Sequence, residues 1–154
     1  MQVVPLEGKY LEQAVELYRL SASMAPYSII TCHPENALAA LTAADAQFWI
    51  FMDQNMVVGL GGFERIRPID GVAEPIICVS PIRRGSGIGW KIGQYLFARI
   101  QTLNLRRVQS IVCEDSPTRA FLVKLGFKQE GVLKAMRLRE GKPIDGLLFG
   151  WVKE

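Results

Sequence analysis

The chain has 154 residues, a net charge of +3 and 49% hydrophobic residues, so it can build one domain with a substantial core and is too apolar to be disordered. Interspersed acids and bases disfavour a nucleic-acid surface, and no apolar run approaches the roughly 20 residues of a membrane span. The N-terminus lacks the features of a signal peptide, and three widely spaced cysteines indicate free thiols. We therefore expect a single cytoplasmic domain over residues 1–154 that binds neither nucleic acid nor a membrane.

The N-terminal half of the chain is predicted to contain a strand, two helices and a hairpin of two strands. Hydrophobic periodicity gives their ranges as 2–6, 8–20, 36–44, 47–52 and 56–67. An irregular loop, 22–33, separates the two helices. Three glycines at positions 59, 61 and 62 inside the second strand of the hairpin indicate a bulge or a close approach by another chain or a ligand.

The C-terminal half alternates strands and helices. The predicted order is a loop (68–72), a central apolar strand (76–79), a long helix (88–103), a strand (107–113), a short helix (116–125) and two final strands (127–137 and 146–152). Ser116-Pro117 is a typical helix start, and Gly126 is a typical stop. The last two strands are joined by a turn at 139–145, and no internal repeat or linker divides the chain.

A glycine-rich loop between the central strand and the long helix carries the strongest chemical signal. The strand stops at Pro81, and Arg84-Gly85-Ser86-Gly87-Ile88-Gly89 then opens an amphipathic helix. Such a turn aims several backbone N–H groups at one point, where the helix dipole adds positive potential. Arg83 and Lys91 add formal charge. The pattern predicts a binding site for a phosphate or pyrophosphate.

Two familiar phosphate loops do not fit this stretch. A Walker loop needs Lys-Ser or Lys-Thr after its last glycine, but Gly89 is followed by Trp90. The dinucleotide fingerprint Gly-x-Gly-x-x-Gly also fails, because Trp90 stands where its third glycine belongs. The loop instead resembles the acetyl-coenzyme A loop, Gln/Arg-x-x-Gly-x-Gly/Ala, of the GNAT family of N-acyltransferases.

A second stretch, 115–127, resembles the family's Asn-x-x-Ala-x-x-x-Tyr-x-Lys-x-Gly-Phe region. Its last lysine, glycine and phenylalanine match, whereas Asp115 replaces the usual asparagine and Leu122 the usual tyrosine. With the order of elements, the resemblance covers nearly the whole chain. It implies an α/β (α+β) GNAT fold with a mixed central sheet of about seven strands and about four helices, splayed at the central strand pair.

The resemblance also implies that acetyl-CoA binds as cosubstrate in the splayed cleft, where backbone groups of the central strand pair with the pantetheine arm and loop amides hold the pyrophosphate. The implied cofactor-binding residues are Ile77, Cys78, Val79, Arg84, Gly85, Ser86, Gly87, Ile88, Gly89, Asp115, Phe121 and Leu122. An amine attacks the thioester directly, and the enzyme supplies proximity, polarisation of the carbonyl and a base for the ammonium proton.

The leucine at position 122 removes a group that many relatives use as general acid, and such a group typically contributes about 10² to 10⁴ in rate. A leucine cannot donate a proton. Three explanations stay open. The thiolate leaves unaided, since a thiol has a pKa of about 8.5; or Ser116, Cys113 or a water acts as the acid instead; or the protein binds coenzyme A and catalyses poorly.

Two glutamates are candidates for the base. Glu74 lies just before the predicted central strand, although the commonest family register falls on Ala73; a bulge at Pro75 would restore the register. Glu114, at the mouth of the next strand, is the second candidate. For each, the alternative interpretation is a solvated surface charge.

Tyr27 and His33, in the loop before the second helix, are candidate acceptor contacts, with ordinary loop residues as the alternative. His33 is the only histidine, which excludes a metal cluster built on several histidines, and no metal is expected. Loops 22–33 and 139–145 should shape the acceptor pocket. Neither is acidic overall, which is slight evidence against a polycationic acceptor.

The sequence therefore predicts an N-acetyltransferase that moves an acetyl group from acetyl-CoA to a primary amine of a small molecule or of a protein or peptide, acting as a monomer or homodimer. The alternative is a coenzyme A-binding or interaction module with weak or lost catalysis. Leu122 favours the alternative. The intact loop Arg84–Gly89 favours the enzyme.

Overall fold

The computed structural model describes residues 1–23 and 33–154. In this part of the chain seven strands form one sheet of order β1-β2-β3-β4-β5-β7-β6. The strands are β1 (Gln2–Pro5), β2 (Gln47–Asp53), β3 (Met56–Arg67), β4 (Val72–Val79), β5 (Arg107–Cys113), β6 (Lys128–Arg139) and β7 (Lys142–Val152). The helices are α1 (Leu11–Ser23), α2 (Ala37–Leu41), α3 (Ile88–Thr102) and α4 (Thr118–Lys124), with short 3₁₀ turns η1 (Gly8–Tyr10), η2 (Pro34–Asn36) and η3 (Pro81–Arg83). The predicted mixed α/β fold and element order are confirmed.

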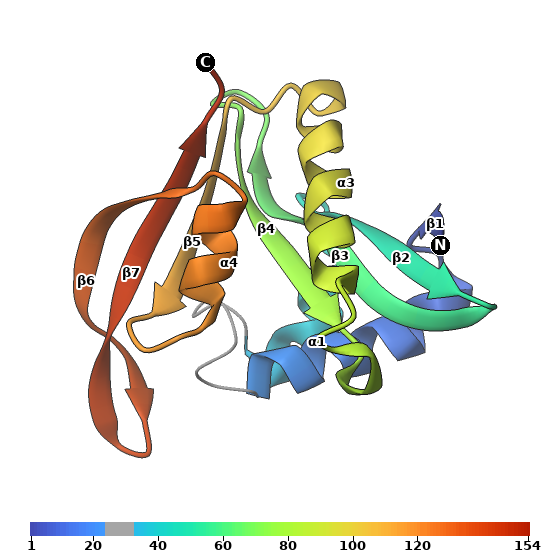
Figure 1. Cartoon of the computed structure of the whole chain (residues 1–154), viewed down its shortest axis with the longest axis horizontal. Helices are drawn as coiled ribbons and strands as arrows, with labels where there is room; N and C mark the ends of the chain where they lie inside the picture. Colours follow the sequence, from blue (N-terminus) through green and yellow to red (C-terminus); the bar gives the residue numbers. More distant parts are fainter. Residues whose placement is uncertain (24–32) are drawn as a thin grey trace.

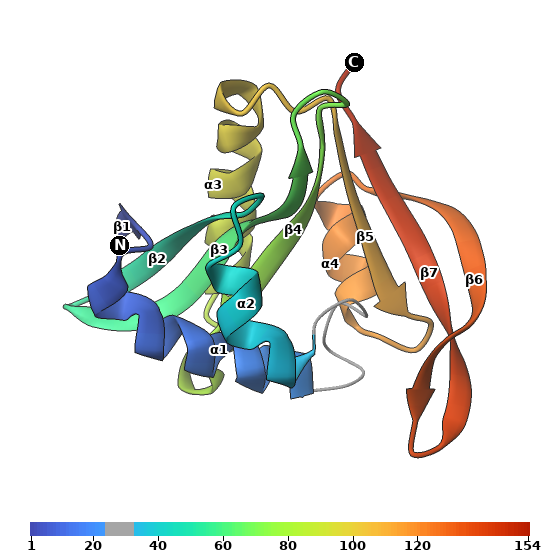
Figure 2. The ribbon, with the colours of Figure 1, turned by 180° about the vertical axis from the view of Figure 1, so that it is seen from behind.

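The sheet separates two layers of helices. Helices α3 and α4 cover the face seen in Figure 1, and α1 and α2 cover the opposite face seen in Figure 2. Side chains alternate along β4, so that Ile76 and Cys78 pack with the α1–α2 core, whereas Ile77 and Val79 pack with the α3 core. Each face is therefore buried by its own helices. None of the described helices combines the length and apolarity needed to cross a membrane.

The sheet is split between β4 and β5, the one parallel neighbour pair. These strands pair only at Val72–Arg107 and Ala73–Val108, and beyond this point they diverge toward their C-terminal ends (Figure 1). Their connection is α3, the type of crossover that parallel neighbours require. The predicted splay of the central strand pair is confirmed.

The glycines in β3 allow α3 to lie close against the sheet. A Cβ atom at Gly59 would lie 2.7 Å from Cδ1 of Ile92, and one at Gly61 would lie 2.4 Å from Cγ2 of the same residue. Real Cβ atoms do not approach so closely. The close approach expected at these glycines is made by a helix of the chain itself.

Strand β4 begins at Val72, four residues earlier than the periodicity predicts, and Glu74 therefore lies inside the strand. Pairing of Pro75 with Phe63 and of Glu74 with Glu64 extends β4 toward its N-terminal end. Since β5 has already diverged, β4 resembles an edge strand at Pro75, which is where a sheet tolerates proline. The predicted bulge at Pro75 is wrong: the irregularity lies on β3, between Glu64 and Arg67.

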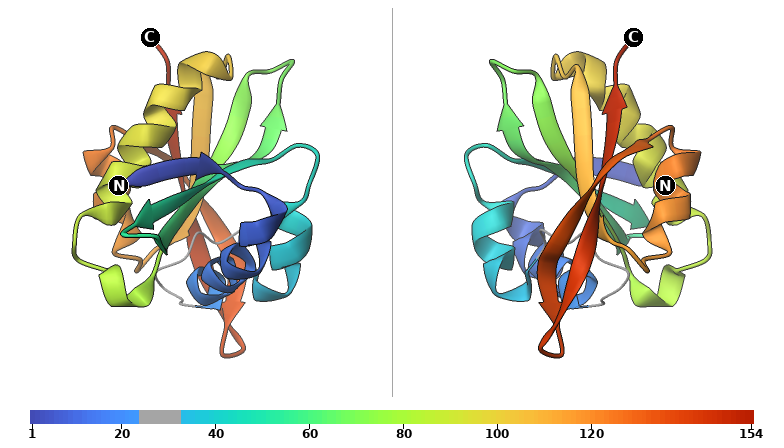
Figure 3. Two further views of the ribbon diagram at one scale, coloured as in Figure 1. Left: turned by 90° about the vertical axis from the view of Figure 1, so that its right-hand side faces the viewer. Right: turned by 90° about the vertical axis from the view of Figure 1, so that its left-hand side faces the viewer.

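The β6–β7 hairpin extends beyond the body of the sheet (Figure 3). Its turn is tighter than expected, because β6 continues to Arg139 and β7 begins at Lys142. Glu140 and Gly141 both have positive φ, at 51° and 76°, as a two-residue hairpin turn requires. Helix α2 is likewise shorter than expected and ends at Leu41.

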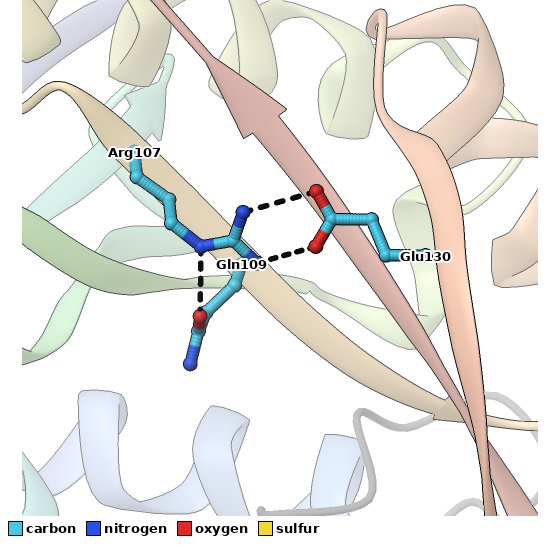
Figure 4. Close-up of polar contacts among 3 residues, drawn as sticks. All are labelled: Arg107, Gln109 and Glu130. Carbon is cyan, nitrogen blue, oxygen red and sulfur yellow. Dashed lines mark hydrogen bonds and ion pairs between the residues drawn. The ribbon is translucent and has the colours of Figure 1, made fainter.

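An ion pair ties β6 to β5 across β7. Arg107 donates to Glu130 from Nη1 at 3.0 Å and from Nη2 at 2.5 Å, and its Nε donates to Gln109 at 3.0 Å (Figure 4). The carboxylate lies over Gly150 of β7, where any Cβ would meet Oε1 of Glu130 at 2.3 Å. The pair stabilises the end of the sheet where β4 and β5 still meet.

Candidate active site

The split between β4 and β5 opens into a cavity of about 530 Å³. Its walls come from β4, α3, α4 and the residues just after α4, with single contributions from α1, β3, β5 and the glycine loop. The lining residues are Ser21, Phe63, Pro75, Ile76, Ile77, Cys78, Val79, Arg84, Gly89, Gly93, Leu96, Phe97, Ile100, Val108, Thr118, Phe121, Leu122, Leu125 and Phe127. Seven of the residues expected to bind the cofactor are among them: Ile77, Cys78, Val79, Arg84, Gly89, Phe121 and Leu122.

The glycine loop lies at the mouth of this cavity. Gly85 and Gly87 have φ of +76° and +82°, a left-handed conformation that side chains disfavour, and no atom of the described residues lies within 4 Å of a Cβ at either position. Gly87 immediately precedes α3, whose first N–H groups have no intrahelical acceptors. Ser86 Oγ donates to the carbonyl of Arg83 and holds the turn closed. The loop thus offers exposed amides at a helix N-terminus.

Arg83 and Arg84 have different environments. Arg83 forms an ion pair with Asp53 at the β2–β3 turn, which fixes the loop against the sheet. Arg84 lines the cavity. Arg84 is therefore the charged side chain of the loop that is placed to meet an anionic ligand at the cavity mouth.

Cys78 forms part of the β4 wall. Burial raises the pKa of its thiol to about 12, and the nearby Glu64 carboxylate acts in the same direction. The thiol is therefore protonated at neutral pH and is not a nucleophile. Cys78 and Cys113 are both free and buried, as the cysteine spacing predicts; Cys32 lies outside the described residues.

The opposite wall comes from α4. Leu122 is 4% exposed and faces the cavity with Phe121 and Thr118. The predicted helix start at Ser116-Pro117 is two residues early: α4 begins at Thr118, whose N–H donates to Ser116 Oγ at 3.2 Å just before the helix. The position for which the sequence resemblance implies a tyrosine thus faces the cavity, and the leucine there supplies no proton donor.

Other predicted residues lie away from the cavity wall. Asp115 accepts two hydrogen bonds from Arg139, at 2.6 and 3.0 Å, and this guanidinium lowers the pKa of its carboxyl. The pair ties the β5–α4 loop to β6. His33 lies before η2, 3.9 Å from Glu35, and does not line the cavity. Tyr27 lies outside the described residues.

Neither predicted base lines the large cavity. Glu74 lines a smaller neighbouring cavity of about 270 Å³, where Arg65 donates to its Oε2 at 2.5 Å; its side chain is 14% exposed. Glu114 follows β5, and its backbone N–H donates to the carbonyl of Asp145. Glu74 lies on the same face of β4 as Ile76 and Cys78, the face that packs with the α1–α2 core.

Glu64 is a carboxylate that the sequence reasoning missed. It lies opposite Glu74 on β3, is 6% exposed and accepts the O–H of Tyr18 of α1 at 2.9 Å. Burial raises the pKa of its carboxyl, against the hydrogen bond from Tyr18. The sequence offered one signal for this residue: Glu64 is the only acid in the apolar strand 56–67. A buried charge needs a partner, so a partner from another element could have been expected.

A Glu64→Gln substitution should raise the urea midpoint of unfolding at pH 7 by the equivalent of about 1 kcal/mol. The amide can still accept the Tyr18 hydrogen bond, and it removes the cost of burying a carboxylate. Because folding raises the pKa of Glu64, its protonated side chain contributes to the stability of the folded state at acid pH. This contribution is lost as the pH rises through the folded-state pKa. The gain of the variant should therefore vanish below the ordinary glutamate pKa of about 4.5.

Glu130→Gln is the control of opposite sign for these unfolding measurements. Arg107 lowers the pKa of Glu130, so the wild-type carboxylate stabilises the fold above its ordinary pKa and ceases to do so as the pH falls. This variant should unfold at lower urea than the wild type at pH 7. Equal urea midpoints of Glu64→Gln and wild type at pH 7 would contradict the assigned cost of burial.

Comparison with known proteins agrees with this geometry. The family model for the acetyltransferase (GNAT) domain matches residues 44–129, more than half of the chain. A search of curated protein sequences finds no match.

Several solved structures share the fold at low sequence identity. A ribosomal-protein-alanine N-acetyltransferase from Brucella melitensis superposes with a TM-score of 0.82 at 17% identity, covering 99% of this chain and 100% of the other. The protein smu.2055 from Streptococcus mutans gives 0.81 at 20% identity, covering 99% of each chain. The spermidine/spermine N-acetyltransferase SpeG from Vibrio cholerae gives 0.77 at 19%, covering 98% and 91%. The family match and the shared fold show that this chain belongs to the GNAT acetyltransferase family.

Proposed function

We propose that the protein transfers an acetyl group from acetyl-CoA directly to a primary amine. The observation that carries the proposal is the cavity between β4 and β5, which opens at the glycine loop and α3. A thioester and its pantetheine arm need an apolar slot with a phosphate site at one end, and this arrangement offers both.

Each part of the site has one task in this proposal. Amides of residues 84–89 and the Arg84 side chain hold the pyrophosphate. Beyond Ala73, no described residue pairs with β4 on its β5 side, so the backbone there is available to pair with the pantetheine arm and to polarise the thioester carbonyl near Ile77. The amine nitrogen attacks the carbonyl carbon, the C–S bond breaks, and a base takes the ammonium proton.

The acceptor class stays broad in this proposal. The related folds include enzymes named for a ribosomal-protein alanine and for spermidine or spermine. Lys134 and Arg139 pair with Asp145 and Asp115 beside the β6–β7 hairpin, so the acids there are already neutralised. This pairing favours a peptide or small monoamine over a polycation.

Release of free thiol from acetyl-CoA, measured across peptides with free N-termini, polyamines and aminoglycosides, tests the proposal. We expect thiol release that depends on at least one amine, and mass spectrometry should find the acetylated amine. Binding of acetyl-CoA with no amine-dependent release would favour the alternative, a coenzyme A-binding module.

Leu122→Tyr tests whether a missing acid limits the reaction. The side chain faces the cavity, so a phenol there can donate a proton to the leaving thiolate. We expect a higher turnover, or a new alkaline limit in the pH–rate profile that reflects a phenol with a pKa of about 10.

Leu122→Phe is the matched control, because it adds the ring without the hydroxyl group. It should keep the wild-type pH dependence. If both variants share the wild-type profile, another group already acts as the acid or none is needed.

A further inference from the structure

The smaller cavity beside the large one has a polar wall. It is lined by Arg65, Arg67, Val72, Ala73, Glu74 and Gln109, from β3, β4 and β5. Glu74 lines the smaller cavity, and Pro75, the next residue of β4, lines the large one. Gln109 and Val108 of β5 are divided in the same way. The two cavities therefore lie at the same level of the split sheet.

The smaller cavity belongs to the face of the sheet that carries α1 and α2 (Figure 2). Glu74 lies on this face of β4 with Cys78, and Gln109 alternates along β5 with Val108, which packs in the α3 core. The large cavity reaches the same face, because Ser21 of α1 is among its lining residues. A molecule held in the smaller cavity therefore approaches the split from the side of α1, opposite to α3.

The wall of the smaller cavity carries hydrogen-bond donors for an anion. The side chains of Arg65 and Arg67 are more than half exposed, and a guanidinium has five N–H groups. Gln109 accepts from Nε of Arg107 through its Oε1 at 3.0 Å, so its amide nitrogen points away from that arginine (Figure 4). The ion pair of Arg67 with Asp70 is exposed and 3.7 Å long, and such a pair contributes little. An incoming anion can therefore replace Asp70.

The charged groups follow one order along β4. Glu74, the predicted base, lies three residues before Ile77, beside which the thioester carbonyl should lie. Arg67 pairs with Val72, two residues further from Ile77, and Arg65 donates to Glu74 at 2.5 Å. Two arginines and one glutamate give the wall a net charge of +1. The wall thus suits a molecule whose ammonium group lies near the thioester and whose carboxylate lies beyond it.

We propose that the acceptor is a small amino acid, an amine that carries its own carboxylate, and that Arg65, Arg67 and Gln109 bind this carboxylate. The inference rests on the proposed function and narrows its acceptor. The ammonium group gives one proton to Glu74, and its nitrogen forms the new C–N bond with the acetyl carbon. The C–S bond breaks, and the sulfur keeps the electron pair and is protonated by the second proton that the nitrogen loses. The products are the N-acetylated amino acid and free coenzyme A.

Matched acceptors test the carboxylate site. Thiol release from acetyl-CoA by the full chain is measured for glycine, alanine, 4-aminobutanoate and 6-aminohexanoate, each against its carboxamide at an equal concentration of neutral amine. At least one carboxylate should have a kcat/KM about tenfold or more above that of its carboxamide. Equal values in every pair, or release only with amines that lack a carboxylate, would overturn the carboxylate site alone. Absence of release with every amine would overturn the proposed function.

Arg67→Gln removes one positive charge from the wall and should lower the ratio of carboxylate to carboxamide kcat/KM to below threefold, through a higher KM for the carboxylate. Because the side chain is more than half exposed, the variant should fold and keep the wild-type affinity for acetyl-CoA. Arg119→Gln makes the same change at an exposed arginine of α4, outside the residues that line either cavity, and should keep the wild-type ratio. A wild-type ratio in Arg67→Gln would place the carboxylate elsewhere and overturn this site.

Discussion

A Glu74→Gln variant should lower the rate of amine acetylation by about 10² or more near pH 7, with nearly unchanged affinity for acetyl-CoA. An ammonium acceptor must lose a proton before it can attack, and the amide of glutamine keeps the shape of the side chain without its basicity. Near pH 9 more of the amine is already neutral, so the deficit should shrink. Steady-state rates between pH 6 and 9, with calorimetric affinities for acetyl-CoA, measure both effects.

The structure supplies a matched control for Glu74. Glu130→Gln also removes a carboxylate that accepts from an arginine at 2.5 Å, but on β6, outside the residues that line the cavity. It should keep the wild-type rate. If Glu74→Gln loses less than threefold at pH 7, then Glu74 is not the base. Glu114 and the buried Glu64 should then be given the same test.

Gly87→Val should raise the dissociation constant for acetyl-CoA at least tenfold. The backbone of Gly87 has a φ of +82° immediately before α3, and a β-branched residue is a genuine outlier in that conformation. The loop must therefore turn differently, and its amides no longer converge on the pyrophosphate. Isothermal titration of the folded variant measures the change.

Gly141→Val separates this loss from a general loss of stability. Gly141 has a φ of +76°, and within the described part of the chain no atom lies within 4 Å of a Cβ there, as at Gly87. The two variants thus share the same backbone strain, of about 1–2 kcal/mol, but Gly141 lies in the β6–β7 turn. Only Gly87→Val should weaken acetyl-CoA binding. Unchanged affinity in a folded Gly87→Val variant would remove the loop from the binding site.

Local chemistry accounts for what the sequence determines in this protein. Two features are encoded within a few neighbouring residues: the apolar period of α3 and the bounds 107–113 of β5. The glycine loop is also encoded locally, because Gly85 and Gly87, which have positive φ, lie directly before α3. The family resemblance rests on these same short stretches.

Pairing between distant segments decided the rest. Strand β4 begins at Val72 because β3 and β5 pair with it there. The sequence pattern within 68–75 does not predict this pairing. Tyr18 reaches Glu64 across 46 residues of sequence. Asp115 accepts a hydrogen bond from Arg139 of β6, and no residue near Asp115 in the sequence indicates this partner. The cavity has the same origin: β4 and β5 pair for two residues and then separate, so its apolar walls come together only once the sheet has formed.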